Sequence, residues 1–210
     1  MSVRRIEESE RCPRCYIKKM WCYCDQLELL DSNHSVTIVM HKREYFLTSN
    51  TAHIIPLVLH KGKTVLKERE SGILNEDDLF LPDREIYMLY PDEKAVPIEE
   101  LNPKSPIQLI VPDGTWVQAR KMGRREPLLK NLRTVSIAPT EKSRYFLRKQ
   151  GREHGVCTYE AIAYAMKHLE GEELYQKMMN QFEKVLKRLH ESRQGVTKRD
   201  EAWKPKDNLE

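Results

Sequence analysis

The sequence predicts an α/β protein with a mostly parallel sheet flanked by helices, preceded by a small metal-binding knuckle. Two observations predict the sheet: short apolar or β-branched segments recur along the chain, and segments of helical character separate them. One observation predicts the knuckle, because four of the five cysteines lie within residues 12–24. A length of 210 residues with 40% apolar composition suits one ordinary domain with a small appendage.

The expected elements follow in chain order. Strands are predicted at residues 35–40, 85–90, 107–111 and 133–138; the run IQLIV at 107–111 is apolar enough for a buried parallel strand. Helices are predicted at 43–59, 115–122, 158–169 and 172–193, and Pro56 leaves the end of the first undecided. In the last helix, apolar residues repeat at helical spacing, which is typical of a packed core helix. Residues 61–84 are expected to be irregular.

The cysteines form the pattern CPRC followed by CYC. Four thiolates within 13 residues can close a tetrahedral zinc site, for which the ligands are Cys12, Cys15, Cys22 and Cys24. Metal binding would supply the folding energy that so short a segment lacks. All four positions are filled by cysteines and nothing suggests an open one, so the site is predicted to be structural. An iron–sulfur cluster and a redox dithiol are the alternatives.

Charge is unevenly distributed along the chain. The formal net charge is +4, yet residues 120–152 contain eleven Lys or Arg and two acidic residues, a local charge of +9. Such a block fits either a phosphate-bearing partner or a solvated helical face. No apolar stretch is long enough for a signal peptide or a membrane span, and we expect a soluble, cytoplasmic protein that does not contact membranes.

Asp113, Gly114, Thr115 and Trp116 come directly after the strand at 107–111. Ligands of open α/β sheets bind at the carboxyl ends of strands, where an Asp can accept a proton or hold an amine. A plain Asp-Gly turn that leads into a helix capped by Thr115 explains the same residues.

Two further polar segments have a functional and a structural interpretation. Thr48-Ser49-Asn50-Thr51 is poor helix material, so these side chains either face a ligand or bend the helix. Thr158 and Glu160 open a helix, where they either line a cofactor pocket or act as N-cap and dipole partner.

Taken together, five segments resemble the DTW-domain family of tRNA-uridine aminocarboxypropyltransferases. They occur in the family's order and cover residues 12–161: CPRC…CYC, HKRE at 41–44, TSNTA at 48–52, DGTWVQARKM at 113–122 and CTYEA at 157–161. Cys157 departs from the family pattern, which usually has Ser there. The change puts a Ser–Glu160 capping box in doubt and makes Thr158 the expected cap.

The resemblance implies an activity, a fold and a division of the chain. It implies transfer of the 3-amino-3-carboxypropyl group from S-adenosylmethionine to N3 of a tRNA uridine, with release of methylthioadenosine. The family looks related to SPOUT-type knotted methyltransferases, which allows a trefoil knot in the C-terminal half. The expected division is a knuckle and linker at 1–30, a SPOUT-like catalytic domain at 31–195 and a mobile tail at 196–210.

Roles for particular residues follow as hypotheses. Asp113 is the expected base for the uracil N3–H, with binding of the substrate amino group as its alternative role. The predicted cofactor-binding residues are Asp113, Gly114, Thr115, Trp116, Ala138, Thr158 and Glu160. The predicted RNA-binding residues are His41, Arg43, Asn50, Arg120, Lys121, Arg124, Arg125, Arg144 and Arg148.

Two rival functions remain open at this stage. A SPOUT-like RNA methyltransferase would release S-adenosylhomocysteine instead of methylthioadenosine. A non-catalytic zinc-knuckle RNA-binding protein would use the same cysteines and basic block, but it would not respond to S-adenosylmethionine. The sequence does not decide the oligomeric state or the uridine that is modified.

Overall fold

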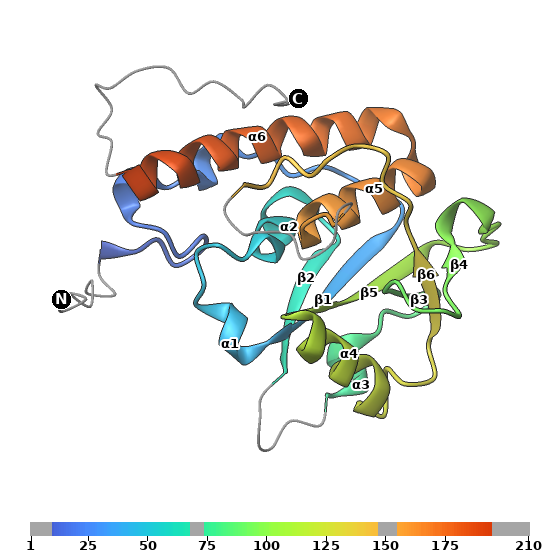
Figure 1. The fold of residues 1–210 in the computed structure, drawn as a ribbon. Coiled ribbons are helices and arrows are strands. Elements are labelled where there is room, and N and C mark those ends of the chain that lie inside the picture. The colour runs from blue at the N-terminus through green and yellow to red at the C-terminus, as the bar shows by residue number, and fades with distance from the viewer. Residues whose placement is uncertain (1–9, 68–73, 147–154, 195–210) are drawn as a thin grey trace.

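The computed structural model describes residues 10–67, 74–146 and 155–194. Within these residues, six parallel strands form one sheet, in agreement with the predicted α/β class (Figure 1). The strands are β1 (Ser35–His41), β2 (Gly62–Lys67), β3 (Glu85–Leu89), β4 (Val96–Pro97), β5 (Ile107–Asp113) and β6 (Arg133–Ser136). The strands β1, β3, β5 and β6 lie where the sequence predicts them.

The strand order is β2-β1-β5-β3-β6-β4. The strand β2 pairs with one side of β1, and β5 pairs with the other side. Beyond β5, the sheet continues with β3, β6 and β4. The order therefore reverses between β1 and β5, and open parallel sheets bind ligands at the carboxyl ends of strands beside such a reversal. In the register, Met40 is opposite Asp113, and His41 is opposite Lys67. These four positions mark the edge of the sheet that carries both cavities described below.

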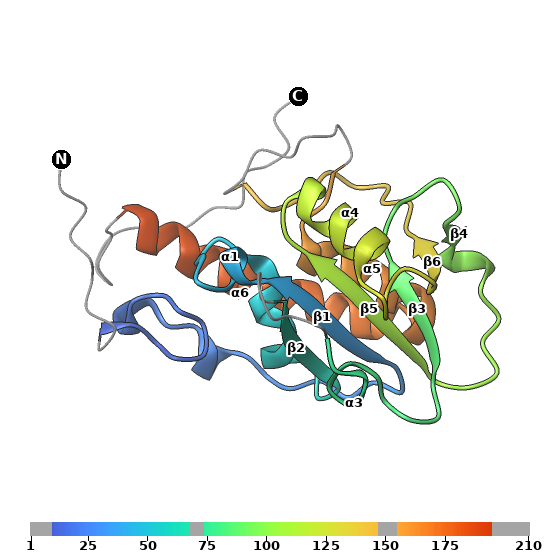
Figure 2. The same ribbon diagram turned by 90° about the horizontal axis from the view of Figure 1, so that it is seen from below.

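Helices cover both faces of the sheet (Figures 1 and 2). One face carries α2 (Ile55–Val58), α5 (Thr158–Glu170) and α6 (Glu172–Gln194); the other carries α3 (Glu76–Leu79) and α4 (Trp116–Arg125). The short α1 (Lys42–Tyr45) follows β1. The central strand β5 is buried along its whole length because helices lie on both of its faces.

The two C-terminal helices are joined by a single glycine. Gly171 has a φ of 96°, in the region that only glycine adopts readily, so α5 can end and α6 can begin without a longer loop. The rings of Tyr159 and Phe182 then stack with centroids 4.6 Å apart, and both side chains are fully buried. This pair holds the start of α5 against α6, and the start of α5 borders the candidate site.

Two predicted segments differ from the structure. The single helix predicted at 43–59 is wrong, since α1 ends at Tyr45, a 3-10 turn spans Thr51–Ile54 and α2 begins at Ile55. The break is local chemistry: the Asn50 side chain accepts the N–H of Ala52, which caps the 3-10 turn. The irregular segment predicted at 61–84 is also wrong, because it contains β2 and α3, and the two-residue β4 was not predicted.

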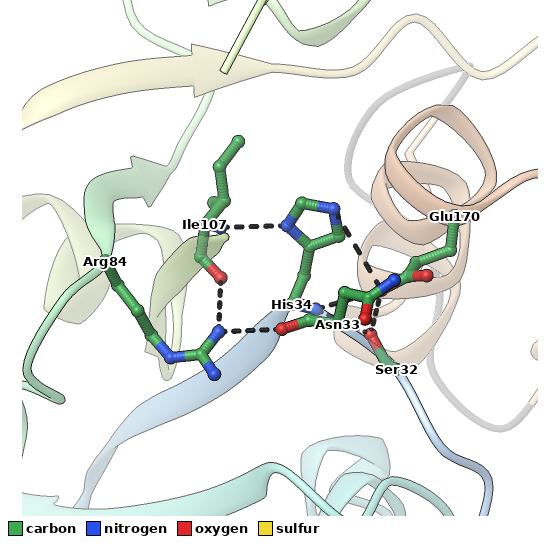
Figure 3. Close-up of polar contacts among 6 residues, drawn as sticks. All are labelled: Ser32, Asn33, His34, Arg84, Ile107 and Glu170. Carbon is green, nitrogen blue, oxygen red and sulfur yellow. Dashed lines mark hydrogen bonds and ion pairs between the residues drawn. The ribbon is translucent and has the colours of Figure 1, made fainter. Parts of the chain in front are cut away.

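A polar cluster joins the opposite, amino-terminal edge of the sheet to α5 (Figure 3). Glu170 accepts hydrogen bonds from the Ser32 hydroxyl and from the His34 N–H, the latter at 2.9 Å. The His34 ring accepts the N–H of Ile107 through Nδ1 at 2.8 Å, so the ring is neutral with its proton on Nε2, facing Glu170. Burial lowers the pKa of His34 despite the nearby Glu170 carboxylate. The cluster therefore ties the starts of β1 and β5 to the end of α5.

In the described part of the chain, no helix is both long enough and apolar enough to cross a membrane. The trefoil knot stays a prediction, as does the division into knuckle, catalytic domain and tail. The tail predicted at 196–210 lies outside the described residues.

Candidate active site and metal centre

The four knuckle cysteines converge on one point. Their sulfur atoms all lie within 4.8 Å of one another, with Cys12 and Cys24 sulfurs 3.8 Å apart and Cys15 and Cys22 sulfurs 3.7 Å apart. Zinc–sulfur bonds of about 2.3 Å in a regular tetrahedron place the sulfurs about 3.8 Å apart. The cluster thus has the size of a four-thiolate metal site.

The electrostatics of the cluster also suit a cation. A hydrogen bond from Cys24 lowers the pKa of the Cys15 thiol to about 5, and the same contact raises the pKa of Cys24. Burial raises the pKa of Cys22 to about 11. Four sulfurs this close cannot all carry negative charge without a positive ion between them, and a bound metal ion supplies that charge.

The knuckle is packed into the rest of the protein. Ile17, Trp21 and Tyr23 are buried and belong to the same core as β1 and α6. Tyr16, with a φ of 61°, donates its hydroxyl hydrogen to the Tyr45 hydroxyl, and its ring lies 4.9 Å from the His53 ring. Because Tyr45 and His53 flank the segment that contains Asn50, the knuckle contacts the chain that forms one wall of the candidate site.

Asp113 is the last residue of β5 and is 4% exposed. Its two carboxylate oxygens accept hydrogen bonds from different elements: Asn50 Nδ2 donates to Oδ2, and the Thr158 hydroxyl donates to Oδ1 at 2.7 Å. Three predicted site residues from distant segments are therefore in direct contact. The carboxylate is held in one orientation by groups on both sides, which is what positioning a substrate atom requires.

The next helix starts at the site in the predicted way. Thr115 is the N-cap of α4, and it shares a capping box with Gln118: the Gln118 N–H donates to the Thr115 hydroxyl, and the Thr115 N–H donates to Gln118 Oε1. A Cβ at Gly114 would lie 3.0 Å from Gln118 atoms, a tighter contact than most side chains make, so Gln118 would have to shift. Glycine at this position lets the chain pass tightly from Asp113 into α4.

A cavity of about 400 Å³ opens above Asp113, and we name it the Asp113 cavity. Of the predicted residues, it is lined by Asn50, Asp113, Gly114, Thr115, Trp116 and Thr158. Its volume lies within the range of small-molecule sites. Trp116 is 43% exposed, and its ring packs edge-on against Tyr90, with centroids 6.2 Å apart. The cavity therefore joins a buried carboxylate to an accessible aromatic surface.

Two predicted cofactor residues do not line this cavity. Ala138 is an exposed residue in the loop after β6. Glu160 is 1% exposed, and its carboxylate accepts hydrogen bonds from the Ser143 hydroxyl, the Arg144 N–H and the Cys157 N–H. This carboxylate therefore ties residues 143–144 to the first residues of α5, and it is not part of the cavity lining.

The N-cap of α5 is Cys157, and the expectation that Thr158 takes this place is wrong. The capping box that the Ser-to-Cys change put in doubt is present, because the Glu160 side chain accepts the Cys157 N–H at 2.9 Å and the Glu160 N–H faces the Cys157 sulfur. Thr158 does not cap the helix, and its hydroxyl donates a hydrogen bond to Asp113.

A second cavity, of about 500 Å³, lies at the same edge of the sheet. We name it the basic cavity; it is lined by His41, Arg43, Lys67, Val117, Gln118, Lys121, Met122, Arg125 and Glu126. Four of the predicted RNA-binding residues thus lie together in it: His41, Arg43, Lys121 and Arg125.

The other predicted RNA-binding residues are dispersed. Arg120 and Arg124 are exposed on α4 and line neither cavity. Arg144 pairs with Glu183 and Glu141. Asn50 lies in the Asp113 cavity, and Arg148 is outside the described residues.

Several lining residues were not predicted. Tyr90 and Pro91 follow β3, and Lys67 ends β2, so the rule that parallel strands gather their carboxyl ends at one edge could have indicated all three once the strands were recognised. Tyr145 also lines the Asp113 cavity, and its hydroxyl donates to the Ser49 carbonyl. No local sequence pattern signals that contact.

A parallel sheet with a cavity at the carboxyl edge of its central strands is typical of α/β proteins that bind small molecules. A cysteine cluster that can hold a metal ion is packed beside it.

The chain belongs to the DTW domain family, which matches residues 9–190. A Drosophila melanogaster protein named tRNA-uridine aminocarboxypropyltransferase 2 is 29% identical over 212 residues, covering 93% of this chain and 84% of the fly protein. Mouse and Macaca fascicularis proteins of the same name are 26% and 25% identical over 81% of this chain. The chain spans 60% of the length of these two mammalian proteins. No solved structure matches the chain.

Proposed function

We propose that this protein transfers the 3-amino-3-carboxypropyl group of S-adenosylmethionine to N3 of a uridine in tRNA. The observation that carries the proposal is the Asp113 cavity, in which Asn50 and Thr158 from two other segments hold the carboxylate beside an accessible tryptophan. The names of the fly, mouse and macaque relatives support the same reaction.

In the proposed reaction, the uracil N3–H gives its proton to Asp113 while N3 attacks the γ-carbon of the methionine moiety. The carbon–sulfur bond breaks, and its electron pair stays on sulfur, which converts the sulfonium into neutral methylthioadenosine. The sulfonium is already a good leaving group, so positioning is the main task of the protein. Asn50 and Thr158 perform it by fixing both carboxylate oxygens.

Trp116 supplies a surface on which a base can stack. Its exposed ring lies at the cavity and is supported edge-on by Tyr90. Base–aromatic stacking contributes about 1–3 kcal/mol per base and does not depend on base identity. We propose that the target uracil stacks here with its N3 edge toward Asp113.

The thiol cluster is proposed to hold zinc in a structural role. Its donor set of four sulfurs and its sulfur–sulfur distances fit a closed tetrahedral site, which leaves no position for a substrate oxygen. The metal would neutralise the clustered thiolates and hold Tyr16 against His53.

The experiment is mass spectrometry of a reaction containing the purified protein, unmodified tRNA and S-adenosylmethionine. We expect a nucleoside that gains an aminocarboxypropyl group, together with methylthioadenosine. A methyl gain with S-adenosylhomocysteine would replace the proposal with a methyltransferase. If both molecules bind but neither is changed, the proposal would be replaced by a non-catalytic RNA-binding protein.

The role of Asp113 is tested with Asp113→Asn, which keeps the shape of the side chain. If the carboxylate is the base, the variant retains the melting-temperature rise caused by S-adenosylmethionine but loses turnover. If the carboxylate holds the substrate amino group, the rise itself disappears. Full activity of the variant contradicts both roles.

A further inference from the structure

The basic cavity lies on the opposite side of α4 from the Asp113 cavity. Its α4 residues are Val117, Gln118, Lys121, Met122 and Arg125, whereas Trp116 and Ala119 line the Asp113 cavity. At 3.6 residues per turn, these two sets point to opposite sides of one helix. Gln118 lines the basic cavity, and it also closes the capping box with Thr115, which lines the other. The first turn of α4 is therefore a wall common to both cavities.

The charge of the basic cavity is positive and incompletely balanced by protein groups. Lys67 and the buried Glu126 form an ion pair at 2.5 Å, so these two charges cancel. Arg43, Lys121 and Arg125 remain, and no ion pair joins them to a carboxylate in the described part of the chain. The lining thus carries a net charge of +3 around about 500 Å³. Like charges gathered around one hollow favour an anion inside it.

We propose that the basic cavity binds a backbone phosphate of the RNA strand, close to the nucleotide whose uracil enters the Asp113 cavity. This inference rests on the proposed function and identifies where the RNA backbone lies relative to the reacting base. A helix with its side chains is about 10–12 Å across, so a strand crossing the first turn of α4 reaches both cavities within a nucleotide or two. Arginine is suited to the contact because its planar fork matches two phosphate oxygens.

The same geometry separates the basic residues of α4 into two groups. All four side chains are exposed, but only Lys121 and Arg125 line the basic cavity, whereas Arg120 and Arg124 line neither cavity. All four have the same formal charge and lie within six residues of one another. If tRNA were held by diffuse electrostatic attraction, both pairs would contribute equally to binding. If a phosphate binds in the cavity, Lys121 and Arg125 contribute more than Arg120 and Arg124.

The test measures tRNA binding by fluorescence anisotropy at several salt concentrations for three double variants. Lys121→Gln/Arg125→Gln removes two charges of the basic cavity. Arg120→Gln/Arg124→Gln removes the two α4 charges that line neither cavity, and Lys130→Gln/Lys187→Gln removes two exposed charges elsewhere. We expect the cavity variant to bind tRNA about tenfold or more weakly at about 0.1 M salt and to reduce the slope of log K against log salt by about one unit per lost phosphate contact. The other two variants should lose about threefold or less.

An equal loss of tRNA binding in the cavity variant and in the Arg120/Arg124 variant overturns the proposal, as does a cavity variant that binds like the original protein. S-adenosylmethionine should raise the melting temperature of all three variants equally, which shows that the Asp113 cavity is intact. Because tRNA binding needs no chemistry, the outcome is separate from the proposed reaction. Loss of binding without any aminocarboxypropyl product supports the phosphate site alone; product formation with unchanged binding supports the reaction alone.

Discussion

Replacing Thr158 by valine tests whether the contact with Asp113 positions the reacting group. Valine has nearly the shape of threonine but no hydroxyl, so it removes the hydrogen bond that Thr158 donates to Asp113 Oδ1 at 2.7 Å. Thr158 is not the cap of α5, because that position belongs to Cys157. The substitution should therefore leave the helix start intact and alter only the orientation of the carboxylate.

The size of the effect follows from the burial of Asp113. A hydrogen bond to a charged group contributes about 1.5–3 kcal/mol, and the 4% exposure of Asp113 leaves water little room to replace it. Each 1.4 kcal/mol corresponds to a factor of about ten. If the whole contribution is expressed in the transition state, kcat/KM should fall by about 10- to 100-fold. The second contact, from Asn50 to Oδ2, still holds the other oxygen and makes complete loss unexpected.

The assay is the rate of methylthioadenosine release at varied S-adenosylmethionine and saturating tRNA. Thr158→Ser is the matched control because it keeps the hydroxyl, and it should retain activity within about threefold of the original protein. The melting temperature of each variant separates a loss of folding from a loss of rate. The reasoning is refuted if the valine variant works within twofold of the original, or if the serine variant loses as much as the valine variant.

Three further predictions concern stability. Glu170→Ala should reduce the free energy of unfolding in urea by about 2 kcal/mol, because it removes the acceptor of at least two hydrogen bonds; an effect no larger than that of the exposed control Glu173→Ala would contradict this. Acid should weaken the same cluster in two stages. Folding lowers the pKa of His34 below 6.5, so below about pH 6.5 the unfolded chain binds a proton on His34 more readily than the folded chain does, and stability falls. Burial opposes the charge of Glu170, but the hydrogen bonds from Ser32 and His34 outweigh it and lower its pKa below 4.5, so its contribution is lost as the pH falls further. A free energy of unfolding that stays level from pH 7 to pH 4 would contradict this prediction. Chelation of the knuckle metal should lower the melting temperature by about 5 °C or more, and it should leave a Cys15→Ser variant nearly unaffected; equal sensitivity of both proteins would argue against a metal held by Cys15.

Interactions between near neighbours could be predicted from the sequence. The knuckle ligands lie within 13 residues, so their spacing alone indicates a common metal site, and the structure brings all four sulfurs together. Thr115 was predicted as a possible helix cap from its place before a helix, and the structure shows it in a capping box with Gln118, three residues on. The long apolar repeat of α6 likewise predicted a buried helical face.

Two segments were predicted wrongly because their local sequences do not favour one type of element clearly. Residues 43–59 contain enough helix formers to suggest one helix, yet Asn50 caps a 3-10 turn and bonds to Asp113, so the helix is interrupted where the side chains are used in the site. The strand β2 was missed because its sequence, GKTVLK, has only two strongly apolar residues. It lies at the edge of the sheet, where a strand needs little apolar surface.

The sequence by itself determined the α/β class, the cysteine knuckle and the segments that carry polar site residues, since these depend on propensity and on spacings of a few residues. Only the tertiary structure decided which segments meet. The contacts of Asp113 with Asn50 and Thr158 span 63 and 45 residues, and the basic cavity gathers Lys67 beside Arg125. Such contacts depend on the order of strands in the sheet, and this order is set by the packing of both faces at once.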